Sequence, residues 1–182
     1  MPLWKGLYTM TKKIIGLYLT LALIIVTIPA LAITVPSITT NDLNTVIIEG
    51  YDVPLAGLFT IMDTLTADAQ AEFDKISAYV NKGQAVAGYF GIDMPDLVLS
   101  EYISLGINNY QESYGDVTAT FGFATEFQVG QTVTVMFGYK DENGSIVWNE
   151  LNAEVVEGGV QIDFPSDLLL KAGSEAILAI LS

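Results

Sequence analysis

The chain has 182 residues, of which 51% are hydrophobic, and a formal net charge of −14. It contains neither cysteine nor histidine. This excludes disulfides, thiolate nucleophiles, the usual serine triad and nearly all zinc and copper sites. All seven basic residues are lysines, so the guanidinium that commonly clamps phosphate or carboxylate is missing. Because an acidic surface repels nucleic acid and anionic membranes, we expect no nucleic-acid partner, and nothing indicates a cofactor.

Residues 1–32 are predicted to be a signal peptide or membrane anchor. Two lysines lead into an apolar run that closes on a small-x-small triplet ending at Ala32, the order typical of an export signal. Pro29 favours extended chain at that end, so we expect cleavage between Ala32 and Ile33. The run is also long enough to be an uncleaved membrane-spanning anchor. In either case the rest of the chain is predicted to be secreted or exposed on the extracytoplasmic surface.

The translation start and the segment between the signal and the main body are the next features of the sequence. Translation from Met10 instead of Met1 would give a more compact signal. Residues 33–95 are predicted to be a polar lead-in followed by a helical segment, with a first strand at 45–49. The segment 52–91 is interpreted as helical, and Thr66 is expected to cap its main helix. Apolar residues then follow at helical spacing: Ala69, Phe73, Ile76 and Val80.

From residue 96 onward the pattern changes to the alternation of half-buried strands. Val117, Ala119, Phe121 and Phe123 alternate with smaller or polar residues. Predicted hairpins lie at 143–144, which would set Tyr139 opposite Trp148, and at 158–159. Residues 96–182 are therefore predicted to form an antiparallel, immunoglobulin-like β-sandwich. The predicted fold class is α+β, with residues 45–95 and the sandwich in one compact unit and the helices at an end or edge of it.

One hypothesis is that the last strand, 174–182, has an exposed edge that could pair with another copy, while the oligomeric state stays open. The ending from 144–148 (GSIVW) through 159–165 (GVQIDFP) to 179–182 (AILS) resembles the endings of uncharacterised secreted proteins of Gram-positive anaerobes. The resemblance implies a β-sandwich in a secreted or surface setting. It brings no activity and no catalytic residues with it.

Two carboxylates in the second hairpin are the first candidate site. A turn at 158–159 would place Glu154 directly opposite Asp163. Because facing like charges repel, a calcium ion between them is one interpretation, and an acid–nucleophile pair of a glycosidase is another. The alternatives without a functional site are that both side chains point into water, or that the strand register differs and the two residues do not face each other.

Three tyrosines are the second candidate site. Tyr102, Tyr110 and Tyr114 lie in or beside a polar loop that is rich in amide side chains. Such rings hold sugars or peptides in binding modules, although a tyrosine at a strand end more often caps the core.

Three functions follow from these observations. The chain is expected to be a non-enzymatic secreted or cell-surface protein with a structural or interaction role, whose partner is a surface protein, peptide or glycan. The alternative is a carbohydrate- or peptide-binding module that uses the tyrosines. A hydrolase built on carboxylates is the third hypothesis, and membrane contact is expected only through a retained N-terminal helix.

Overall fold

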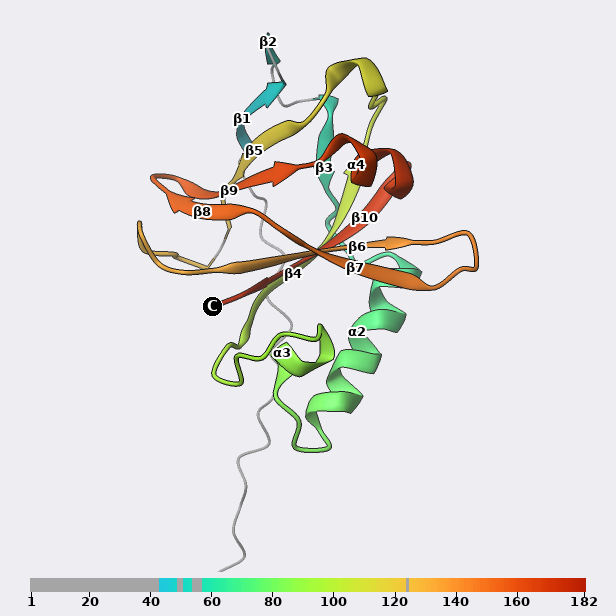
Figure 1. Ribbon diagram of the computed structural model, residues 1–182, viewed down its shortest axis with the longest axis vertical. Helices are drawn as coiled ribbons and strands as arrows, with labels where there is room; N and C mark the ends of the chain where they lie inside the picture. Colours follow the sequence, from blue (N-terminus) through green and yellow to red (C-terminus); the bar gives the residue numbers. More distant parts are fainter. Residues whose placement is uncertain (1–42, 49–50, 54–56, 124) are drawn as a thin grey trace, which may run out of the picture. The chain divides into compact units, whose positions relative to one another are not determined.

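A computed structural model describes residues 43–48, 51–53, 57–123 and 125–182. All of these belong to one of the two compact units into which the chain divides, Ile33–Ser182. The described part is mostly antiparallel β-sheet with three short or medium helices (Figure 1).

In the described residues, ten strands form two five-stranded sheets, and neighbouring strands within each sheet are all antiparallel. The first sheet has the order β2-β1-β5-β9-β8 and the second has the order β3-β4-β10-β6-β7. The strands of the first sheet are β1 (Leu43–Ile48), β2 (Tyr51–Val53), β5 (Val117–Phe121), β8 (Ala153–Val156) and β9 (Gly159–Phe164). Those of the second are β3 (Phe59–Ile61), β4 (Leu99–Ile107), β6 (Thr134–Lys140), β7 (Ile146–Leu151) and β10 (Glu175–Leu181).

The two sheets enclose a shared apolar core, an arrangement compatible with a β-sandwich. Strand β5 shows the expected alternation: Val117, Ala119 and Phe121 are buried, and the threonines between them are half-exposed. Buried residues of the second sheet, such as Leu105 and Leu178, belong to the same core. Alternating inward residues from two facing sheets are what holds such an architecture together.

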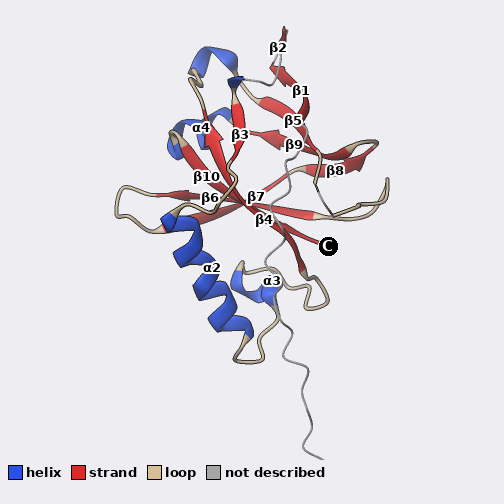
Figure 2. Ribbon diagram, turned by 180° about the vertical axis from the view of Figure 1, so that it is seen from behind, coloured by secondary structure: helices blue, strands red, loops and turns tan. Residues whose placement is uncertain are grey.

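A second core lies on the other face of the second sheet, where helices α2 (Ala67–Val80) and α3 (Val86–Tyr89) pack (Figures 1 and 2). The helices were expected at an end or edge of the sandwich, and that expectation is wrong. Strand β10 explains the difference, because six consecutive apolar residues, Ala176–Leu181, are all buried. A strand that is apolar on both faces needs a layer on each side.

The helical interpretation of 52–91 is correct only in its second half. Thr66 caps α2, its side chain accepting a hydrogen bond from the Ala69 backbone N–H at 3.3 Å, and Phe73 and Ile76 are buried as predicted. The residues before it form β2 and β3 instead. Phe59 pairs with Ile107 of β4, and this long-range pairing overrides the local helical spacing.

The last strand is not an open edge. Strand β10 lies between β4 and β6, so both of its edges are paired. The remaining helix, α4 (Ser166–Ala172), follows β9, and a single 3-10 turn occupies Glu112–Tyr114. The described edges of the two sheets are β2, β8, β3 and β7.

Candidate functional site

Tyr102 does not belong to the predicted tyrosine site. Its side chain is fully buried in the core under the helices, and its hydroxyl donates to the carbonyl of Ala69 at 2.9 Å. Its ring packs on Phe73 with centroids 5.2 Å apart. Burial raises the pKa of the Tyr102 hydroxyl. The prediction of Tyr102 as a ligand-binding residue is therefore wrong, because alternation along β4 turns it toward α2 and away from the loop.

Tyr110 and Tyr114 do lie together. Their rings form a T-shaped pair with centroids 6.1 Å apart, and both pack against the sandwich core while staying partly exposed. The Tyr110 hydroxyl donates to the carbonyl of Gly115 at 2.6 Å. These contacts give both rings a capping role over the end of the core. Asn108 and Asn109, which precede Tyr110 in the chain, are exposed, so a binding role at this pair stays a prediction.

Glu154 and Asp163 are not opposite one another. Glu154 pairs with Gln161 across β8 and β9, whereas Asp163 pairs with Thr118 of β5 and accepts its hydroxyl at 2.6 Å. The predicted register is wrong because the two-residue turn lies at Glu157–Gly158, one residue earlier than predicted, and Gly159 already pairs with Val156. The calcium and glycosidase hypotheses lose the facing pair on which they rested. Within the described residues, no group of three or more acidic side chains could hold a metal ion.

Asp163 instead lines an acidic groove of about 410 Å³ beside the joint between β7 and β8. Asp116 and Glu150 also line this groove. Asp116 accepts the Ser166 backbone N–H at 2.8 Å, so it and Asp163 each have a structural partner. Those partners account for two of the three carboxylates without any ligand.

The buried carboxylate of Glu72 was missed by the sequence analysis. Glu72 is 4% exposed and accepts hydrogen bonds from Lys75 Nζ (2.7 Å), the Tyr89 hydroxyl (2.7 Å) and Trp148 Nε1 (3.2 Å). Desolvation raises the pKa of Glu72, but these three donors outweigh it, and the pKa lies below its usual value. Glu72 and its three donors together join α2, α3 and β7. Because its carboxylate accepts hydrogen bonds from three protein side chains, we interpret Glu72 as a structural residue that links these elements.

A second feature that the sequence analysis missed is an open groove along the outer edge of β8. It has a volume of about 560 Å³ and lies between the loop 129–133 and β8. Val129 in the loop is 72% exposed, although valine is usually buried. Val133, Ala153 and Val156 add partly buried apolar surface. We call this feature the edge groove.

The backbone of β8 is unpaired on the side that faces away from β9. The Asp163 N–H donates to the Asn152 carbonyl at 3.0 Å. In an antiparallel ladder this makes Ala153–Ile162 a non-hydrogen-bonded pair, and Val155–Val160 is the next one. The N–H and C=O groups of Ala153 and Val155 therefore point away from β9. In the part of the chain that the structure describes, β8 has no neighbour on that side, and no backbone hydrogen bond to the loop 129–133 is formed.

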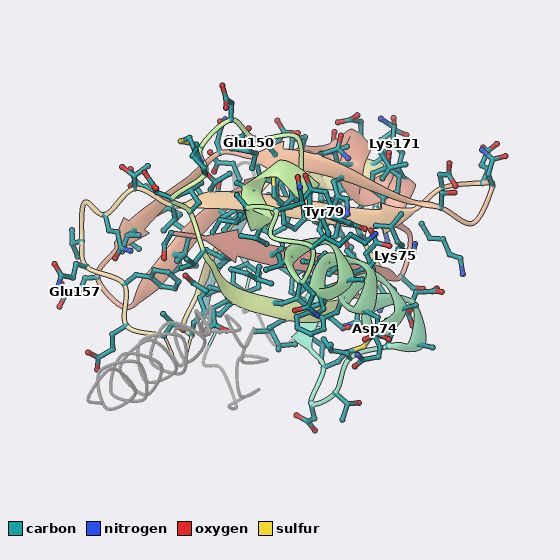
Figure 3. The ribbon with its side chains drawn as sticks, turned by 90° about the horizontal axis from the view of Figure 1, so that it is seen from below. Asp74, Lys75, Tyr79, Glu150, Glu157 and Lys171 are labelled. Atoms are coloured by element: carbon teal, nitrogen blue, oxygen red, sulfur yellow. The ribbon has the colours of Figure 1, made fainter. Side chains whose placement is uncertain are left out.

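The charge of the edge groove is negative. Glu154 and Glu157 line it, and both are exposed. Three of the four lysines in the described part are in ion pairs elsewhere, namely Lys75–Glu72, Lys140–Asp68 and Lys171–Asp167. Figure 3 shows Glu157 on the opposite side of the view from Lys75 and Lys171. No ion pair between described residues neutralises the carboxylates of the groove.

The sequence held only part of the signal for the edge groove. Strand β8 contains neither lysine nor proline and pairs with β9 without a bulge, so three of the devices that protect natural edge strands are missing from it. Its protection is limited to its four-residue length and the charge of Glu154. The strand could not be recognised as an edge, because strand order depends on long-range pairing that local patterns do not show.

The predicted cleavage site, Ala32 and Ile33, lies outside the described residues. Among the helices that the structure does describe, none is long and apolar enough to cross a membrane.

Comparisons with protein-family models, curated proteins and solved structures find no match to this chain. The resemblance to secreted proteins of Gram-positive anaerobes stays a prediction.

Proposed function

We propose that this chain is a non-enzymatic interaction domain that works outside the cytoplasm, either secreted or held at the cell surface. The observation that carries the proposal is the edge groove, in which the unpaired backbone of Ala153 and Val155 lies beside exposed apolar and acidic side chains. An unpaired strand edge offers a ready row of hydrogen-bonding groups to a partner.

The location in this proposal is supported by the sequence pattern of residues 12–32, which is typical of an export signal. At the level of architecture, we propose an immunoglobulin-like sandwich. Two antiparallel sheets around one core support it, although each sheet here has five strands and helices cover one face.

The location is tested by the intact mass of the natively expressed protein, measured separately in the culture medium and in the membrane fraction. A species that begins at Ile33 in the medium would make the domain freely secreted. A full-length species in the membrane fraction, cleaved from intact cells by added protease, would make it a surface-anchored domain. A full-length species that stays in the cytosol and is protected from protease would contradict the proposal.

The interaction role is tested by nuclear magnetic resonance titration of the domain with two sets of ligands. One set contains short peptides of different charge, and the other contains oligosaccharides. We expect peptides to shift the amide signals of 129–133 and of β8, Ala153–Val156. If neither set shifts these signals, the edge groove is not a contact surface.

The second candidate function is binding of a sugar or peptide by the tyrosine pair, favoured by the partial exposure of Tyr110 and Tyr114 and by the two exposed asparagines that precede Tyr110 in the chain. The same titration separates the two candidates. Shifts confined to 108–115 would assign the function to the tyrosine pair.

A further inference from the structure

The structure points to a specific partner for the edge groove: we infer that it binds an extended peptide segment, added as an antiparallel strand to the outer edge of β8, with small apolar residues opposite Ala153 and Val155 and a lysine or arginine between them, opposite Glu154. This inference rests on the proposed function and names the partner's chemistry and binding geometry.

The backbone geometry favours addition of a strand. The outward N–H and C=O groups of Ala153 and Val155 are two residues apart, the repeat at which one strand bonds another. All pairings among the described strands of this sheet are antiparallel, and we assign the added strand the same antiparallel direction relative to β8. The edge groove provides the volume beside β8 for such a segment.

Side-chain alternation then fixes what the partner presents. Residues of the added strand opposite Ala153 and Val155 point to the same face as those side chains, toward the apolar core side of β8. Residues opposite Glu154 point to the outer face, where its carboxylate is exposed and has no ion pair with a described residue. A cation opposite Glu154 forms a favourable cross-strand pair. The preferred segment therefore has small apolar residues opposite Ala153 and Val155 and a basic residue between them.

The charge of the chain argues against a second copy as the occupant. After residue 32 there are four lysines and 21 acidic residues, so two copies repel each other. At the edge itself, two β8 strands pairing side by side would bring Glu154 and Glu157 of both copies together. A basic segment from another protein experiences attraction at the same place.

The probe for the test is a short peptide with capped ends in which valine and lysine alternate, titrated by calorimetry into the complete secreted form or the solubilised full chain. In antiparallel addition, the valines opposite Ala153 and Val155 direct their N–H groups at β8. Methylation of the valine nitrogens is therefore expected to abolish binding, whereas methylation of the lysine nitrogens leaves it unchanged. Replacement of the lysines by glutamate is also expected to abolish binding.

On the protein side, Glu154→Lys is expected to weaken binding of the lysine peptide by about tenfold, because an attractive cross-strand pair becomes repulsive. Glu142→Lys is the matched control, since it makes the same charge change at the exposed β6–β7 hairpin. Equal losses in both variants would mean that only the net charge matters and would overturn the assigned geometry. Both sites are exposed, and circular dichroism checks that both variants fold.

The remaining outcomes separate this inference from the proposed function. Equal binding of the valine-methylated and unmethylated peptides would overturn strand addition. Binding of other peptides at the edge groove, but not of the lysine peptide, would overturn the basic partner while the proposed function stands. A lack of any shift at the groove, with peptides and with oligosaccharides, would overturn both.

Discussion

Trp148 donates its indole Nε1–H to the buried carboxylate of Glu72 across 3.2 Å, although 76 residues separate the two in the chain. This bond ties α2 to β7, at the edge of the second sheet. Tyr89 of α3 donates to the same carboxylate oxygen. The helical layer is thus attached to the sheet by directed bonds as well as by apolar packing, and Glu72 is the acceptor that all three elements share.

We predict that Glu72→Gln lowers the free energy of unfolding by about 1–3 kcal/mol, because the neutral amide cannot accept all three donors and places its own N–H₂ among them. Urea denaturation followed by tryptophan fluorescence measures the effect. Glu142→Gln, at an exposed hairpin, is the control and is expected to change stability by less than about 0.5 kcal/mol. Equal effects of the two substitutions would contradict a structural role for Glu72.

The same carboxylate is predicted to make stability depend on pH. The pKa of Glu72 is lower in the folded chain than its usual value, since its donors outweigh desolvation. Its contribution is therefore complete above the unfolded pKa of about 4.3 and is lost as the pH falls through the lower folded value. The difference in unfolding free energy between the wild type and Glu72→Gln should be constant near neutral pH and shrink on acidification. A difference that grows in acid would mean that the folded pKa is raised.

Much of the sheet structure was predictable, because alternation is a local signal. Strand β5 is an example: its alternating Val117, Ala119 and Phe121 identify both the strand and its buried face. What local patterns could not give was strand order, and the central place of β10 was therefore missed.

Strand register was the second feature that local patterns could not predict, because a turn that differs by one residue changes every cross-strand pair. In the β6–β7 hairpin, the Asp141 side chain accepts the backbone N–H groups of Asn143 and Ser145, which builds a longer turn than the Asn143–Gly144 pair alone predicts. Trp148 consequently lies opposite Gly138 instead of Tyr139. The predicted pair of Glu154 and Asp163 was wrong for the same reason, because it depended on an assumed position of the turn. The edge groove depends on strand order and so stayed hidden.

Gly138 is predicted to be required by the tryptophan opposite it. A Cβ at this position would lie 2.7 Å from Trp148 Cζ3, and the indole is held by its bond to Glu72. Gly138→Ala should therefore lower the unfolding free energy by about 1–3 kcal/mol, the usual cost of overpacking. Gly106→Ala is the matched control in β4, where the closest contacts of a Cβ are ordinary at 3.5 Å. A smaller loss at Gly138 than at Gly106 would show that the indole moves freely.

Tyr102 is predicted to contribute to stability and not to ligand binding. Tyr102→Phe removes the hydroxyl that donates to Ala69 and should cost about 0.5–1.5 kcal/mol in unfolding free energy. Binding of peptides or sugars should stay unchanged, because the ring is fully buried. Tyr114→Ala provides the comparison, since only there would a tyrosine-dependent ligand lose affinity. Loss of affinity in Tyr102→Phe at unchanged stability would restore Tyr102 as a site residue.

The register of β8 against β9 gives the last prediction. Because Glu154 faces Gln161, Gln161→Lys should create a cross-strand ion pair and stabilise the fold by about 0.2–1 kcal/mol. A double-mutant cycle with Glu154→Gln isolates that pair from the other charges near residue 161, since distant interactions cancel in the cycle. Asp163→Lys in the same cycle should show weaker coupling to Glu154, because its partner on the neighbouring strand is Thr118. Stronger coupling at position 163 than at position 161 would reinstate the facing carboxylate pair, and with it the case for a cation between them.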